Sequence, residues 1–222
     1  MYTKYLKGLA ITQIITIILI ISSCSDTTGT SDTLPYYTIS EEFNDYCWFD
    51  SSSYWVFQND STLFTDTIKI MDIDDTKRFH DEQGGFNYQA VELFTKSNAF
   101  NISEYELTAG NSEPNPGSMN SLLRLYKNDS SYQLVFLPQY PLGEEIIMGE
   151  EIGVYTNIEF FESLWLNDKT YHDVYHTNVV ISSKNTVYNY WIAKNHGIIK
   201  TNSTIDDQTI SISLISDQLY QN

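Results

Sequence analysis

Cysteine is nearly absent from this sequence. Its 222 residues include only Cys24 and Cys47, which could form at most one disulfide and cannot build a thiolate metal cluster. Cys47 lies in the apolar stretch Tyr46–Phe49, where a free cysteine behaves as a small hydrophobic residue. The sequence therefore excludes a disulfide-rich scaffold, and we expect Cys47 to be buried and unreactive.

Basic residues are also scarce. Lys and Arg number 12 against 29 Asp and Glu, which gives a net charge of −17 at pH 7. A surface this acidic repels phosphates, so it argues against nucleic acid and against direct binding to acidic lipid headgroups. We expect a soluble surface outside the cytoplasm and no nucleic-acid partner.

The common catalytic and cofactor motifs are missing. The sequence contains no G-x-S-x-G, H-E-x-x-H, C-x-x-C, P-loop or dinucleotide glycine pattern. Glycoside hydrolysis needs two carboxylates about 5–9.5 Å apart across a cleft, whereas adjacent acids on a strand point to opposite faces. This disfavours the four acidic doublets, Glu41-Glu42, Glu144-Glu145, Glu150-Glu151 and Asp206-Asp207. We expect neither an enzyme nor a cofactor; a hydrolase with scattered catalytic residues is an alternative.

Two candidate metal sites fail on geometry. His172 and His176 form an H-x-x-x-H pair, but their neighbours predict a strand, along which four residues span about 13 Å. Asp72–Asp75 resembles the start of an EF-hand loop, yet Lys77 and Gln83 occupy the positions that need Gly and Glu. We therefore expect no metal, and a solvated turn at Asp72–Asp75.

Long apolar runs are limited to one, Leu9–Ile21, which follows Lys4 and Lys7. Only 14 residues separate Lys7 from Ser22, whereas a bilayer-spanning helix needs about 20. A short apolar run after basic residues is typical of an export signal. We therefore expect residues 1–23 to be a signal peptide.

The end of this run, Ile21-Ser22-Ser23-Cys24, resembles the lipobox of bacterial lipoproteins. The resemblance implies cleavage between Ser23 and Cys24, a diacylglyceryl group on the Cys24 thiol and an acylated N-terminus. Two acyl chains suffice for stable anchoring. The alternative is an ordinary secretory peptide that contains a cysteine.

The mature chain would then have 199 residues and, with ten basic against 29 acidic residues, a net charge of −19. Residues 24–35 are small and polar, which predicts a flexible tether. Residues 36–222 suit a single domain. We expect attachment to the outer membrane through the lipid, because no Asp follows Cys24 directly; the periplasmic and surface faces both stay open.

Residues 36–222 are rich in β-branched and aromatic residues, which favour strands. Short alternating runs predict ten strands, at Tyr54–Gln58, Thr65–Asp72, Tyr88–Thr95, Ser121–Lys127, Tyr132–Leu137, Gly153–Leu166, Thr170–Ile181, Thr186–Ala193, Ile198–Thr201 and Thr209–Ile215. Turn residues at 128–130, 167–169 and 195–197 have hairpin spacing. We expect a mainly β fold, an antiparallel meander that forms a curved or partly closed sheet (half-barrel or barrel-like). Little helix is expected, and Ile158–Leu166 is the best helical candidate.

A second resemblance concerns cell-envelope lipoproteins of Bacteroidota, a group of mostly unassigned function. The stretch Trp191–Lys200 (WIAKNHGIIK), Ser53–Phe57 and Asn167–Val174 are similar to motifs of that group. The resemblance implies a curved antiparallel sheet and supplies no catalytic residues. In such a sheet Gly197 would take a positive-φ turn position, with Trp191 and Ile198 on the core face.

The aromatic residues allow a binding role. Trp48, Trp55, Trp165 and Trp191, with 17 tyrosines, could form a stacking platform for a glycan or an apolar groove, although filling the core is the expected role. Outward coplanar tryptophans would favour a glycan, a deep apolar cavity would favour an apolar ligand, and a cleft with a perturbed carboxylate would favour an enzyme.

The similarity to Bacteroidota also implies O-glycosylation at Asp-(Ser/Thr)-x tripeptides of exported proteins. Four matches occur, at residues 26–28, 32–34, 60–62 and 66–68. The candidate sites are Thr27 and Thr33 in the tether and Ser61 in a loop. Thr67 is the least favoured, because it lies in an expected strand.

Overall fold

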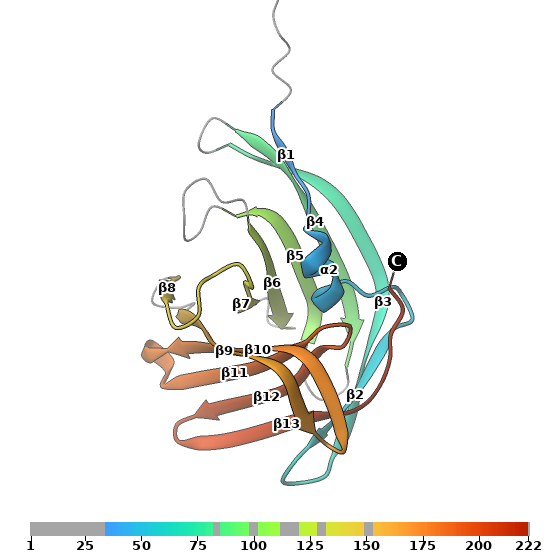
Figure 1. Ribbon diagram of the computed structural model, residues 1–222, viewed down its shortest axis with the longest axis vertical. Coiled ribbons are helices and arrows are strands. Elements are labelled where there is room, and N and C mark those ends of the chain that lie inside the picture. Colours follow the sequence, from blue (N-terminus) through green and yellow to red (C-terminus); the bar gives the residue numbers. More distant parts are fainter. Residues whose placement is uncertain are drawn as a thin grey trace, which may run out of the picture. The chain divides into compact units, whose positions relative to one another are not determined.

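The computed structural model describes residues 34–81, 85–97, 102–111, 120–127, 132–148 and 153–221 (Figure 1). The chain divides into two units, Met1–Leu34 and Pro35–Asn222. The lipobox Ile21–Cys24 and the candidate glycosylation sites Thr27 and Thr33 lie outside the described residues, so their roles stay predictions.

The second unit is built around one sheet of 13 strands, with the order β7-β6-β5-β4-β3-β2-β13-β12-β11-β10-β9-β8 and β1 beside β4. The elements are β1 (Tyr36–Tyr37), α2 (Glu41–Cys47), β2 (Tyr54–Asn59), β3 (Thr65–His80), β4 (Phe86–Lys96), β5 (Ile102–Asn111), β6 (Asn120–Lys127), β7 (Tyr132–Phe136), β8 (Glu145–Ile147), β9 (Val154–Leu166), β10 (Lys169–Ile181), η2 (Ser182–Lys184), β11 (Thr186–Ala193), β12 (Gly197–Ile205) and β13 (Gln208–Gln218). All pairs along this order are antiparallel. The predicted antiparallel meander is confirmed, and its end strands β7 and β8 do not pair, so the sheet is not closed into a barrel.

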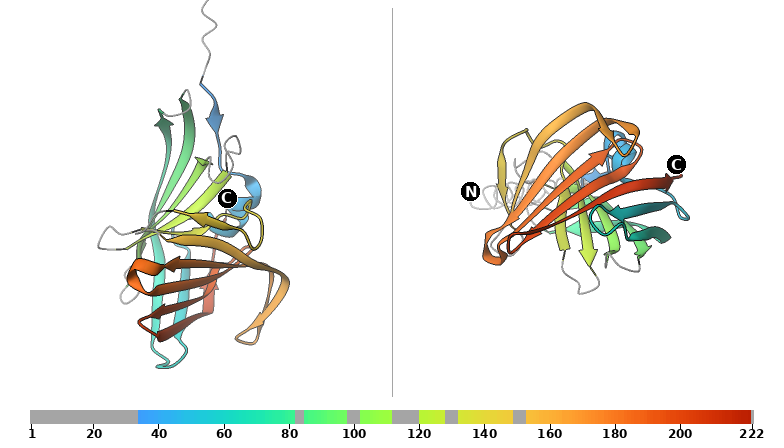
Figure 2. Two further views of the ribbon diagram at one scale, coloured as in Figure 1. Left: turned by 90° about the vertical axis from the view of Figure 1, so that its left-hand side faces the viewer. Right: turned by 90° about the horizontal axis from the view of Figure 1, so that it is seen from below.

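The sheet consists of two meanders, β2–β7 and β8–β13, joined where β13 pairs with β2. It curves so that the two halves enclose α2 (Figures 1 and 2). Phe43 of α2 stacks on Phe136 of β7, and Tyr46 contacts both Phe136 and Tyr175 of β10. We call the face that carries this core the inner face and the opposite one the outer face.

Helix α2 was missed by the sequence analysis. Ser40 caps it by accepting a hydrogen bond from the Phe43 N–H, and acidic residues occupy its first turn, where the helix dipole favours them. Phe43, Tyr46 and Cys47 are buried on one side. Seven residues are too few for this spacing to stand out as a periodicity.

All ten predicted strands occur, several of them longer than expected. Strands β1, β5 and β8 were missed. The expected turn at Asp72–Asp75 is wrong, because these residues continue β3 and pair with β4. Likewise, the helical option for Ile158–Leu166 is wrong, because the segment pairs with β10 as part of β9.

Two predicted turns hold. Asn167 and Asp168, between β9 and β10, have φ values of 50° and 60°, as a tight hairpin requires. Gly197 has a φ of 70°, and a Cβ atom there would lie 3.2 Å from the Phe49 ring. Glycine is therefore favoured at 197 by both backbone conformation and packing.

Every described element and both hydrophobic clusters of the core lie within Pro35–Asn222. A chain of residues 25–222 therefore keeps every core contact of the described residues, and the experiments below use this chain.

Candidate functional site: a cavity on the inner face

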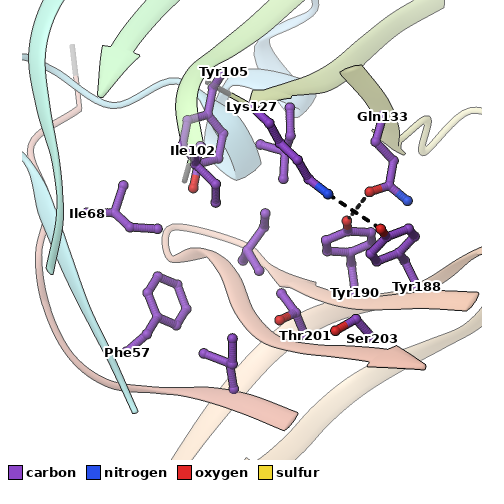
Figure 3. A pocket seen from close by; sticks show the side chains of 13 residues that line it. Phe57, Ile68, Ile102, Tyr105, Lys127, Gln133, Tyr188, Tyr190, Thr201 and Ser203 are labelled. Carbon is purple, nitrogen blue, oxygen red and sulfur yellow. Dashed lines mark hydrogen bonds between the residues drawn. The ribbon is translucent and has the colours of Figure 1, made fainter. Parts of the chain in front are cut away.

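A cavity of about 120 Å³ lies on the inner face, between strands of both meanders. It is lined by Phe57, Ile68, Ile102, Tyr105, Leu125, Lys127, Gln133, Tyr188, Tyr190, Ile198, Thr201, Ser203 and Ile212 (Figure 3). The strands that supply them are far apart in sequence but are brought opposite each other by the curvature of the sheet. The cavity is thus a product of the fold and not of any local motif.

Most of the wall is apolar. Phe57, Ile68 and Ile198 are each less than 10% exposed and point inward because side chains alternate along their strands. A dry apolar cavity of about 150 Å³ can bind benzene. The cavity is therefore large enough for a ligand, or part of one, of roughly that size.

Polar groups gather on one side of the cavity (Figure 3). The Lys127 ammonium donates to the Tyr188 hydroxyl at 3.4 Å and lies 5.1 Å from the centre of that ring. The Tyr190 hydroxyl donates to Gln133 Oε1 at 2.6 Å. Burial raises the pKa of Tyr190 well above its ordinary value, which keeps this hydroxyl protonated and able to donate.

Gln133 is unusual in this group. The residue is 5% exposed, and its Nε2 atom is buried without a hydrogen-bond partner among the described residues. A buried donor without a partner costs free energy. The same wall therefore has hydrogen-bonding capacity that the described protein atoms leave unused.

The four tryptophans do not form a platform. Trp55 is buried, as predicted, and its indole donates to the His196 carbonyl at 2.8 Å. Trp191 is only partly buried; it packs against the main hydrophobic cluster and stacks on His176 with Lys200 above it. Ile198 is buried in that cluster, as predicted. Trp165 is 66% exposed, and no ring contact between two tryptophans occurs in the described part of the chain.

Trp48 borders a second, more polar cavity of about 140 Å³, which is also lined by Asn44, Asp45 and Gln221. Asn44 Oδ1 and the Trp48 indole nitrogen are buried there without partners in the described chain. Both residues are nevertheless partly exposed, and water could reach the site and bridge these atoms. The inner cavity is the more apolar of the two.

The outer face carries a charged network. Glu106 of β5 is 5% exposed and accepts hydrogen bonds from Arg78, Arg124 and Tyr126 at 2.8, 3.0 and 3.1 Å. Burial, followed by the charges of Glu92 and Glu106, raises the pKa of Glu104. That perturbed carboxyl does not line the inner cavity.

A second polar cluster joins β13 to the turn after β11. The His196 ring lies 2.5 Å from Asp217 Oδ2, and Lys169 Nζ lies 3.4 Å from Asp217 Oδ1. Burial by itself raises the pKa of Asp217, but the hydrogen bond from His196 and the charges of His196 and Lys169 outweigh it and lower the pKa. This cluster ties the end of β13 to the motif that contains Gly197.

The remaining predicted site residues do not meet at the cavity. His172 and His176 lie on β10, and no group of three potential metal ligands occurs among the described residues. Cys47 is buried, as predicted, and burial raises the pKa of its thiol well above the ordinary value. Ser61 is exposed in the turn after β2, whereas Asp66 of the disfavoured site is 5% exposed and binds Ser97.

Comparison with known proteins assigns no family. No protein-family model matches the sequence, and no curated protein matches it. A solved structure that does match belongs to a Bacteroides fragilis protein that is thought to be exported and has a YmcC-like fold. The match covers 78% of this chain and 98% of that chain, at 10% identity and a TM-score of 0.32. At that level the similarity assigns neither a fold family nor a function.

Proposed function

We propose that this chain is an exported, lipid-anchored protein of the cell envelope whose β domain binds a small apolar ligand without catalysis. The observation that carries the binding role is the inner cavity, where apolar side chains from both meanders surround about 120 Å³. The sequence analysis gave one structural criterion for each alternative: coplanar tryptophans for a glycan, an apolar cavity for an apolar ligand, and a cleft with a perturbed carboxylate for a hydrolase. These criteria support the apolar ligand. The tryptophans are not coplanar outward rings, and the perturbed Glu104 lies away from the cavity.

The anchor rests on the sequence. The lipobox Ile21–Cys24 supports cleavage at Ser23–Cys24 and lipidation of Cys24, and residues 24–35 would serve as the tether. No helix in the described ranges is long and apolar enough to cross a membrane. Outer-membrane attachment, with either face open, remains part of this proposal.

The expected affinity follows from the size of the cavity. Burying about five methylenes at roughly 0.8 kcal/mol each gives about 4 kcal/mol, which corresponds to a dissociation constant near 1 mM. A six-carbon alcohol, hexan-1-ol, is therefore a suitable neutral probe. Its binding to the 25–222 chain can be followed by two-dimensional NMR titration.

A blocked cavity provides the test. Ser203→Trp on β12 places an indole in the cavity wall and should abolish the saturable shifts caused by hexan-1-ol. Thr204→Trp is the matched control, because the neighbouring residue does not line the cavity; it should bind as the unmodified chain does. No saturable binding to the unmodified chain, or equal binding to both variants, would overturn the proposed site.

A further inference from the structure

Lys127 is a basic residue beside an apolar cavity in a strongly acidic chain. Its ammonium contacts only the hydroxyl and ring of Tyr188 among the contacts found in the described residues. The cations Arg78, Arg124, Lys169 and Lys194 each have a carboxylate within 4.0 Å. Lys127 has no such carboxylate among the described residues, and neither have Lys69, Lys77, Lys96, Lys184 and Lys200. Of these six lysines, Lys127 is the one that lines the inner cavity.

Gln133 supplies a second donor on the same side of the cavity. Its Oε1 atom is occupied by the Tyr190 hydroxyl, while its buried Nε2 atom has no partner in the described part of the chain. Figure 3 shows the Lys127 and Gln133 head groups beside the two tyrosine hydroxyls, with Phe57 and Ile68 on the other side of the cavity. The cavity is therefore amphipathic, with donors at one side and an apolar wall opposite.

We infer that the ligand is an amphipathic acid, whose apolar chain enters the cavity and whose carboxylate binds Lys127, with Gln133 Nε2 as a second donor. This inference rests on the proposed function and specifies its ligand. A carboxylate offers two acceptor oxygens and one negative charge, which match one ammonium and one amide donor. An amine would be repelled by Lys127, and a phosphate dianion would meet a single cation.

The acidic surface does not contradict this assignment. Exposed charges further away than about 10 Å are largely screened at 0.1 M salt, whereas the contact between Lys127 and the carboxylate is local. Charge-assisted hydrogen bonds are also stronger than neutral ones. A neutral alcohol would fill the same apolar space but would leave the ammonium without a counter-charge.

Matched probes test the inference on the 25–222 chain at pH 7 and 0.1 M salt. We expect hexanoate to bind about tenfold more tightly than hexan-1-ol, since a hydrogen bond to a charged group contributes enough for that ratio. Hexylammonium should bind more weakly than the alcohol. Lys127→Met should reduce hexanoate affinity to within about threefold of hexan-1-ol while leaving alcohol binding unchanged.

Two further variants keep the result interpretable. Lys200→Met removes a cation that lies over Trp191, away from the cavity, and should preserve the preference for hexanoate. Lys127→Arg retains the charge and should preserve most of the preference for hexanoate. This variant tests the role of the charge if circular dichroism shows that Lys127→Met does not fold.

The outcomes separate the two proposals. If neither six-carbon probe binds, the proposed function is wrong and this inference falls with it. If hexan-1-ol binds as tightly as hexanoate, the cavity is a binding site but its ligand is not selected as an acid. If Lys127→Met keeps the preference for hexanoate, another group supplies the charge and the assignment to Lys127 is overturned.

Discussion

Strand β6 carries two basic side chains that are held in different ways, Arg124 on the outer face and Lys127 on the inner face. On the outer face Arg78 and Arg124 both bind the carboxylate of Glu106, at 2.8 and 3.0 Å. On the inner face Lys127 rests against Tyr188, without a carboxylate among the described residues. The first arrangement joins strands β3, β5 and β6 to one another, whereas the second places a cation in the wall of the inner cavity. The contrast distinguishes charges that stabilise the sheet from the charge that we assign to a ligand.

The largest effect should come from breaking the outer network at its centre. Glu106→Gln removes the charge that two arginines share and leaves both without full compensation at a mostly buried position. We expect the free energy of unfolding to fall by about 2 kcal/mol, which is less than for a fully buried pair because the arginines are partly exposed. Urea denaturation measures the change. Glu162→Gln, at an exposed position of β9, is the control, and a similar loss there would contradict the special role of Glu106.

A smaller effect should follow at the cluster of Asp217, His196 and Lys169. Asp217→Asn weakens the hydrogen bond to His196 and the ion pair with Lys169, and we expect a loss of about 1 kcal/mol at pH 7. The pKa of Asp217 is lowered in the folded state, so its contribution is present above the pKa of the unfolded chain, near 4, and is lost as the pH falls through the folded pKa.

The difference between Asp217→Asn and the unmodified chain should therefore shrink as the pH falls below about 4, the pKa of the unfolded chain, and through the lower pKa of the folded state. Thermal unfolding at a series of pH values gives this profile. Asp207→Asn, in the exposed turn between β12 and β13, should show no such pH-dependent difference. A difference in stability that stays constant as the pH is lowered to full protonation of the carboxylates would mean that the charge of Asp217 is not its source.

Replacing Glu104 should stabilise the folded chain at pH 7, whereas replacing Glu106 should destabilise it. Its pKa is raised by burial and by the charges of Glu92 and Glu106, so its ionisation disfavours the folded state and stability falls as the pH rises through the folded pKa. Glu104→Gln should raise the unfolding temperature slightly at pH 7 and change it least near pH 4. Differential scanning calorimetry at the two pH values decides, and a destabilised variant at pH 7 would contradict the assigned cause.

Local sequence patterns predicted some strands of the sheet and missed others. The alternation of Thr67, Ile68, Lys69 and Ile70 was enough to place a strand with one buried face, and Asn167-Asp168 was enough to place a hairpin. Strand β5 alternates in the same way, with Tyr105 and Leu107 buried, but three glutamate or serine positions obscured it. The burial of Glu106 depends on Arg78 and Arg124 from other strands, which no local pattern reports.

The cavity also depends on residues from distant strands, so the sequence could not predict it. Ile68 and Ile198 are 130 positions apart in the sequence and line one space only because the sheet curves. In the sequence, Lys127 looks like an ordinary strand end before the predicted turn at 128–130, which lies outside the described residues. The sequence supplied the set of alternatives, and the inner cavity supports the apolar-ligand alternative that we propose.

The smallest effect on stability should come from the inner cation itself. Lys127→Met removes a cation–π contact at a partly exposed position, which contributes about 0.5 kcal/mol, and replaces it with a flexible apolar chain that suits the cavity wall. We expect the ligand-free stability to change by no more than that, whereas Arg124→Met should cost about 1 kcal/mol because Glu106 loses a partner.

Hexanoate at ten times its dissociation constant should then stabilise the unmodified chain by about 1.4 kcal/mol. The same concentration should stabilise Lys127→Met much less, because its affinity is lower. If Lys127→Met instead lowers the ligand-free stability as much as Arg124→Met does, Lys127 is a structural cation like those of the outer face, and the contrast between the faces disappears.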